Sequence, residues 1–157
     1  MATRETTRPK GDVGSEAAPD NIFELLVHVA NTSDLEMGMT LHVNGQVLTG
    51  KLISGATFWA ESAAELRERT AGPVEVIEAL ASSMDRVADE YREDYGDDAR
   101  DADGEPMWSF VHLRDTRTLT PEGPIPASGA LWRGRLASID GFSLGELRQR
   151  SMDADRE

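Results

Sequence analysis

The sequence predicts a single α+β domain in which a small, strongly bent antiparallel sheet packs against helices. Three observations support this fold class. Apolar residues alternate on both sides of Asn44-Gly45, a pair that accepts positive φ and favours a type I′ hairpin. Gly50 falls inside the second strand of this hairpin, where a missing side chain suits a bulge or sharp bend and lets the sheet curl toward a partial barrel. Residues 73–95 place apolar side chains at the spacing of one helix face.

The first predicted element is a helix that begins after Asp20, a good N-cap residue. Its apolar stripe consists of Ile22, Phe23, Leu26, Val27 and Ala30. Residues 31–34 are Asn-Thr-Ser-Asp, whose side chains compete for backbone hydrogen bonds and should end the helix. The hairpin then occupies residues 39–53.

Two further helices are predicted after the hairpin. The first carries Phe58, Trp59, Ala63 and Leu66 and ends by Gly72. The second begins at Pro73, which is tolerated in a first turn, and ends at Gly96. Its stripe comprises Val76, Ile77, Leu80, Met84, Val87, Ala88, Tyr91 and Tyr95. We expect the sheet to pack against this long helix.

The remaining elements follow an acidic loop at residues 97–106. Strands are predicted at 107–113 and 131–136. Three prolines between them, Pro121, Pro124 and Pro126, indicate an extended connection without a regular ladder. Ser143 and Glu146 have the spacing of a capping box, which predicts a short closing helix that ends near Arg150.

Composition limits the size and location of the protein. The predicted domain covers residues 20–150, and the segments 1–19 and 151–157 lack apolar anchors and are expected to be flexible tails. The chain has no cysteine, no signal-peptide core and no apolar run long enough to cross a bilayer, so we expect a cytoplasmic protein that does not bind membranes. The net charge of −13 reflects halophilic adaptation, codon bias or a surface for a basic partner.

The sequence offers no catalytic, cofactor or metal site. The histidines are His28, His42 and His112, and their spacing does not force their rings to converge. The acidic run 97–105 lacks the final glutamate of an EF-hand loop, so a solvated loop is expected. The overall negative charge also disfavours nucleic-acid binding. We therefore expect a binding protein, which is not an enzyme and has no nucleic-acid partner.

The first hairpin is similar to one signature of the Sm-like RNA-binding proteins. The matching pattern is Leu41-x-Val43-Asn44-Gly45-x-Val47-Leu48-x-Gly50-x-Leu52, and Arg133-Gly134 matches a dipeptide of the second signature. The resemblance implies a bent barrel preceded by a helix. The family's RNA-contacting Asp and Asn are replaced here by Ala56 and Trp59. An Sm-like nucleic-acid-binding module is therefore the alternative function.

A broader stretch, from Asn21 to Leu147, resembles the gas vesicle accessory protein family called GvpU. The matching segments are Phe23–Val27 with Ala30-Asn31, Met39–Gly55, Phe110–Asp115, Leu131–Leu136 and Asp140–Gly145. The resemblance implies a non-enzymatic, gas vesicle associated protein that acts on the assembly, surface properties or clustering of these shells. Its partners would be a shell protein or another accessory protein, and it could form an oligomer.

The predicted partner interface consists of Trp132, Arg133, Arg135 and Phe142. Tryptophan and arginine are the residue types that most often anchor protein interfaces. Two arginines on one short strand also depart from the acidic composition of the chain. The alternative is that Trp132 faces the core while each arginine pairs with a neighbouring carboxylate.

Overall fold

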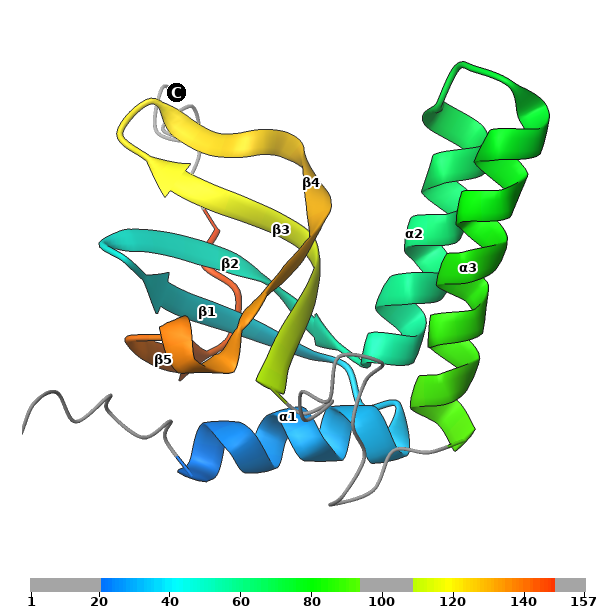
Figure 1. Ribbon diagram of the computed structural model, residues 1–157. Coiled ribbons are helices and arrows are strands. Elements are labelled where there is room, and N and C mark those ends of the chain that lie inside the picture. The colour runs from blue at the N-terminus through cyan, green and yellow to red at the C-terminus, as the bar shows by residue number, and fades with distance from the viewer. Residues whose placement is uncertain (1–20, 94–108, 149–157) are drawn as a thin grey trace, which may run out of the picture.

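The computed structural model describes residues 21–93 and 109–148, which form helices and a five-stranded sheet (Figure 1). In chain order the elements are α1 (Asn21–Ser33), β1 (Met37–Val43), β2 (Gln46–Ile53), α2 (Gly55–Arg69), α3 (Val74–Glu93), β3 (Phe110–Thr120), β4 (Gly123–Arg135), the 3-10 turn η2 (Leu136–Ser138) and β5 (Gly141–Leu144). The strand order is β4-β3-β2-β1-β5, and all neighbours are antiparallel. The predicted α+β class is therefore confirmed. The sheet ends in β4 and β5 and does not close into a barrel.

Several predicted features lie outside the described residues. These are the tails at 1–19 and 151–157, the Asp20 cap, the stop at Gly96, the acidic run 97–106 and the end of the closing helix at Arg150.

The β1–β2 hairpin has the predicted turn. Asn44 has φ 49° and Gly45 has φ 77°, the two positive values that a type I′ turn requires. A bulge also interrupts the β2–β3 pairing between Thr49 and Lys51, as the position of Gly50 predicted. A Cβ on Gly50 would lie 2.8 Å from the carbonyl oxygen of Arg114, so β3 can approach this closely because residue 50 has no side chain.

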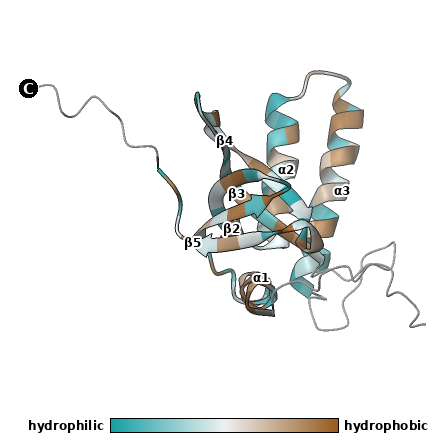
Figure 2. Ribbon diagram, turned by 90° about the vertical axis from the view of Figure 1, so that its left-hand side faces the viewer, coloured by the Kyte–Doolittle hydropathy of each residue, from teal (hydrophilic) through white to brown (hydrophobic). Residues whose placement is uncertain are grey.

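The main core lies between α1 and one face of the sheet. Phe23, Val27 and Ala30 of the predicted α1 stripe are at most 2 % exposed and Leu26 is partly buried, whereas Ile22 is 60 % exposed, so its inclusion in the stripe was wrong. The buried residues pack against Met39 and Leu41 and the other apolar side chains of this face. Figure 1 shows α1 running across this side of the sheet, and Figure 2 shows its apolar residues in brown. Burial of these aliphatic and aromatic side chains stabilises the domain through the hydrophobic effect.

Helices α2 and α3 form a hairpin that stands beside the sheet (Figures 1 and 2). The main partner of α3 is α2, and α2 in turn contacts β3. This differs from the expectation that the sheet packs directly against the long helix. The helix face that is buried contains Ala81, Ala88 and Tyr91, whereas Val76 and Leu80 are 54 % and 52 % exposed. Small alanines lie at the contact because they let the two helices approach closely.

The base of the helical hairpin is attached to the rest of the fold at Gly55. The backbone N–H of Gly55 donates a hydrogen bond to Oδ1 of Asn31 at 2.7 Å. The Tyr91 ring lies where a Cβ of Gly55 would be, 2.2 Å from the nearest ring carbon. Ser54 caps α2 by accepting a hydrogen bond from the N–H of Thr57.

Two predictions for the second half of the chain are wrong. Pro121 lies in the turn after β3, and Pro124 and Pro126 are part of β4, which pairs with β3 in two stretches at residues 123–125 and 130–135. Pro124 and Pro126 are compatible with a strand because β4 is at the edge of the sheet, where a missing N–H donor can face away from the ladder. The predicted capping box is not at a helix: Ser143 pairs with Thr40 in β5, and the described residues after Leu144 are not helical. Strand pairing with β1 outcompetes the local capping signal there.

Candidate interaction surface

Charge is segregated between the strands and the helical hairpin. The strands carry five cationic side chains and one carboxylate, Asp115; the cations are Lys51, Arg114, Arg117, Arg133 and Arg135. Helices α2 and α3 carry nine carboxylates and four arginines. The carboxylates are Glu61, Glu65, Glu68, Glu75, Glu78, Asp85, Asp89, Glu90 and Glu93, and the arginines are Arg67, Arg69, Arg86 and Arg92. The net charge of −13 therefore hides a locally basic sheet.

Strand register places these five cations on one face of the sheet. Lys51 pairs with Arg114 and Thr49 pairs with Arg117 across β2 and β3, and directly paired residues point to the same side. Arg133 and Arg135 pair with alternate residues of β3, His112 and Phe110 respectively. We call the surface formed by Lys51, Arg114, Arg117, Arg133 and Arg135 the arginine face. It is opposite the face that packs against α1.

Arg114 is neutralised within the protein. Its guanidinium donates hydrogen bonds to Glu61 of α2, at 2.5 Å, and to Glu36 in the loop before β1. Burial lowers the pKa of Arg114, but the hydrogen bonds and charges of the two carboxylates outweigh burial, so the pKa of Arg114 is raised. Arg114 thus joins α2 to the sheet and is not available to a partner.

Arg133 is held between aromatic rings. Its Cζ lies 3.5 Å from the centroid of the Phe110 ring and 5.4 Å from that of Trp59. Its Nε donates a hydrogen bond to Nε2 of His112 at 3.2 Å. The Cζ of Arg135 lies 5.4 Å from the same Phe110 ring. These cation–π contacts fix the guanidinium of Arg133 while leaving it charged.

The buried side chain of His112 is the hydrogen-bond partner of Arg133. Its side chain is 1 % exposed and its ring centroid lies 4.8 Å from that of Phe58 and 5.8 Å from that of Tyr91. Burial, followed by the positive charge of Arg133, lowers the pKa of His112 to about 3. The imidazole is therefore neutral at physiological pH, and its Nε2 can accept the hydrogen bond from Arg133.

The structure divides the four residues of the predicted interface between two faces. Arg133 and Arg135 lie on the arginine face. Trp132 is on the opposite face, paired with Leu113 and packed against the main core. Phe142 lies on β5, near the other edge of the sheet, and stacks on Phe23 of α1 with ring centroids 5.0 Å apart.

Sequence reasoning missed the aromatic side chains that support the arginines, Phe110 and Trp59. The alternation Phe110-x-His112-x-Arg114 could have placed Phe110 on the same face as an arginine, because side chains alternate along a strand. Trp59 could not be found in this way, since its position depends on how α2 packs against β3. The same is true of Lys51 and Arg117, which join the arginine face only through strand register.

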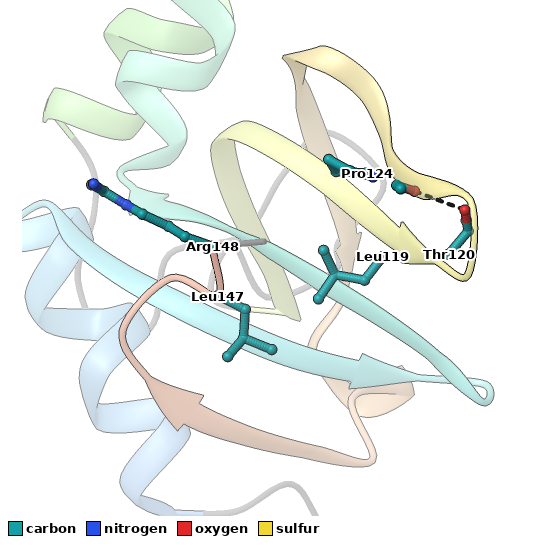
Figure 3. A pocket seen from close by; sticks show the side chains of 6 residues that line it. Leu119, Thr120, Pro124, Leu147 and Arg148 are labelled. Carbon is teal, nitrogen blue, oxygen red and sulfur yellow. Dashed lines mark hydrogen bonds between the residues drawn. The ribbon is translucent and has the colours of Figure 1, made fainter. Parts of the chain in front are cut away.

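A pocket of about 310 Å³ lies at the turn between β3 and β4, at the end of this hairpin away from Arg133 and Arg135 (Figure 3). It is lined by Leu119, Thr120, Gly123, Pro124, Leu147 and Arg148. Leu119 and Leu147 project toward each other across it, and Oγ1 of Thr120 donates a hydrogen bond to the carbonyl oxygen of Gly123 at 2.7 Å. The lining is mainly apolar with one charged side chain, so this pocket contains no acid–base pair.

Within residues 21–93 and 109–148, no cluster of three or more His, Cys, Asp or Glu side chains could hold a metal ion. Within the same ranges, none of the helices is both long enough and apolar enough to span a bilayer.

Comparison with protein families identifies the chain. The model of the family described as gas vesicle protein GvpU-like matches residues 20–147 of the 157 residues, which is nearly the whole described fold. The chain belongs to the gas vesicle GvpU-like family. The predicted resemblance is thus confirmed, and membership indicates an association with gas vesicle components. Searches of curated proteins and of solved structures gave no match.

The two positions that differ from the Sm-like signature lie on α2 in this GvpU-like protein. Ala56 is 5 % exposed and packs with Tyr91, and Trp59 packs against the same small cluster and contacts Arg133. Ala56 therefore packs within the helical hairpin, and Trp59 packs between the hairpin and the sheet.

Proposed function

We propose that this GvpU-like protein is a non-enzymatic accessory protein that acts on the assembly, surface properties or clustering of gas vesicles. It does so by binding a vesicle shell protein or another accessory protein. Family membership supports the vesicle as its place of action. The arginine face supports binding as its mode of action, because it combines exposed positive charge with aromatic side chains.

The observation that carries this proposal is the stacking of Arg133 on Phe110 beside the exposed Arg135. A guanidinium held by an aromatic ring loses little conformational entropy when it binds a partner. Phe110 and Trp59 are each partly buried and add apolar contact area around this charge. Trp132 and Phe142 contribute indirectly, since they hold β4 and β5 against the core.

The experiment is co-sedimentation of the full chain with isolated gas vesicles. The double variant Arg133→Glu with Arg135→Glu should lose binding while its far-UV circular dichroism stays unchanged. The control Arg69→Glu with Arg86→Glu makes the same change in net charge on the exposed surface of the helical hairpin and should bind like the wild type. Loss of a central anchor accelerates dissociation, so a wash step should separate the variants further.

Two results would contradict the proposal. If the folded Arg133/Arg135 variant co-sediments normally, the arginine face is not the binding surface. If the wild type binds neither vesicles nor any isolated vesicle protein, the accessory function itself is wrong. Because Arg133 is partly buried, the single variant Arg135→Glu provides a fold-neutral check; it should weaken binding without altering the packing of β4.

A further inference from the structure

We propose that the ligand of the arginine face is an acidic segment of a partner protein, whose carboxylates pair with Lys51, Arg117, Arg133 and Arg135. An acidic segment specifies the chemistry of the partner in the proposed function. The proposal rests on that function only for the statement that the partner is found at the gas vesicle.

The first argument is that these four cations have no counter-ion among the described residues. Within residues 21–93 and 109–148, no carboxylate lies within ion-pair distance of any of them, although the chain has 29 acidic and 16 basic side chains. Arg114, on the same face, has two carboxylate partners, and three of the four arginines of the helical hairpin are paired; these are Arg67, Arg69 and Arg92. Unpaired positive charge is thus concentrated on the sheet.

The second argument is geometric. The rings of Phe110 and Trp59 fix the guanidinium of Arg133, and its Nε is already bonded to His112. The Nε of Arg117 likewise donates to the carbonyl oxygen of Ala127 at 3.0 Å, which orients its side chain along the outer strand β4. In both arginines the terminal nitrogens remain to bind a carboxylate, an arrangement that favours charge-assisted hydrogen bonds.

The third argument decides between an acidic protein segment and a nucleic acid. Helix α2 borders the arginine face, as the contacts of Glu61 with Arg114 and of Phe58 with His112 show. Glu61 lies at the face and the helical hairpin carries eight further carboxylates, and this negative charge repels a long polyanion such as RNA. A short acidic segment can stay on the sheet, where charges beyond a Debye length of about 8 Å are screened at physiological salt.

The test measures fluorescence anisotropy of a labelled oligoglutamate peptide titrated with the full chain. An oligolysine peptide and oligo-U RNA of equal length are the comparison probes. We expect the wild type to bind oligoglutamate, to bind it more weakly as salt is raised, and not to bind the other two probes. The variant Lys51→Gln with Arg135→Gln, which changes two exposed side chains, should weaken binding about fivefold, and adding Arg133→Gln should bring the loss to about tenfold or more.

The matched control is Arg69→Gln with Arg86→Gln, which removes the same charge from the helical hairpin and should leave the affinity for oligoglutamate within about twofold. Equal losses in the two double variants would mean that only net charge matters and would overturn the proposal. Tighter binding of oligo-U than of oligoglutamate would assign the face to nucleic acid. Self-association at low salt that the arginine variants abolish, without peptide binding, would assign it to a second copy of the chain.

These outcomes are distinguishable from failure of the proposed function. A wild-type protein that sediments with vesicles but ignores oligoglutamate refutes the acidic partner and leaves the accessory function intact. A protein that binds oligoglutamate through the arginine face but binds no vesicle component refutes the accessory function and leaves the acidic ligand intact.

Discussion

The bulge at Gly50 allows a quantitative test of how the sheet is bent. In the variant Gly50→Val, the new Cβ would lie 2.8 Å from the carbonyl oxygen of Arg114 and 3.1 Å from the Cα of Thr116. Both atoms belong to the backbone of β3, so a change of rotamer cannot relieve the crowding and the strand itself must move. Overpacking of this kind typically costs about 1–3 kcal/mol, and the two methyl groups of valine place this variant toward the upper end of that range.

Urea unfolding measures this cost. A loss of about 2–3 kcal/mol, divided by a slope of about 1–3 kcal/mol per molar urea, lowers the midpoint by roughly 0.7–3 M. Gly50→Ala adds only the Cβ and should fall between wild type and Gly50→Val. The control is Gly141→Ala, in which the added Cβ meets no atom within 4 Å and which should keep the wild-type midpoint. A wild-type midpoint for Gly50→Val would refute the explanation that Gly50 is needed for close approach of β3.

Three further predictions concern the helices, the buried histidine and the net charge. Leu80→Asp should lower the free energy of unfolding by less than about 1 kcal/mol because Leu80 is half-exposed. Ala81→Asp buries an unpaired charge and should lower it by several kcal/mol. Thermal unfolding of the two variants compares these neighbouring positions directly. His112 has a pKa of about 3 in the folded state against 6.5 when unperturbed, so the unfolded state binds more protons between these values and stability falls as pH drops through that range. His112→Gln should lack this contribution, about 2 kcal/mol between pH 7 and pH 5, in a comparison of urea midpoints. If the acidic surface is a halophilic adaptation, the midpoint should rise as NaCl increases toward molar concentration, because screening reduces carboxylate repulsion; an unchanged midpoint would identify an ordinary acidic protein.

Elements with a strong local signal could be predicted from the sequence. The stripe of α1, the Asn44-Gly45 turn and the bulge at Gly50 each depend on a few neighbouring residues, and the structure confirms them, except that Ile22 of the stripe is exposed. The burial pattern of α3 could not be predicted, because Val76 and Leu80 fit a helical stripe as well as Ala81 does. Which of them is buried depends on the position of α2.

Two segments that join the sheet were predicted wrongly. The prolines argue locally against a strand, yet Pro121 lies in the turn before β4, while Pro124 and Pro126 lie on β4 at the edge of the sheet, where β3 supplies a partner on one side. Ser143 and Glu146 have the spacing of a helix cap, yet residues 141–144 complete the sheet beside β1. Residues 123–125 pair with residues 118–120 in a hairpin, and the proline-based prediction missed this pairing. Residues 141–144 instead pair with a strand about 100 residues earlier in the chain, and a local pattern does not contain this information.

The predicted partner interface could also be derived only in part from the sequence. Arg133 and Arg135 stood out because two arginines on one strand are unusual in an acidic chain, but Trp132 directly precedes Arg133 and therefore points to the opposite face. Alternation alone could have separated Trp132 from the two arginines. It could not have added Lys51, which is more than 80 positions away in sequence and joins the face through its pairing with Arg114.

Net charge is therefore a poor guide to the partner of this protein. A total of −13 disfavours an acidic ligand if the charge is assumed to be uniform. The fold separates the charges. Strand register places the cations of the sheet on one face, while the helical hairpin carries most of the carboxylates of the described residues. At physiological ionic strength a ligand responds mainly to charges within about 8 Å, so an acidic segment bound beside Arg133 and Arg135 interacts more strongly with these arginines than with carboxylates farther along the helical hairpin. Local charge, and not the total, then determines which partner binds and how its affinity changes with salt.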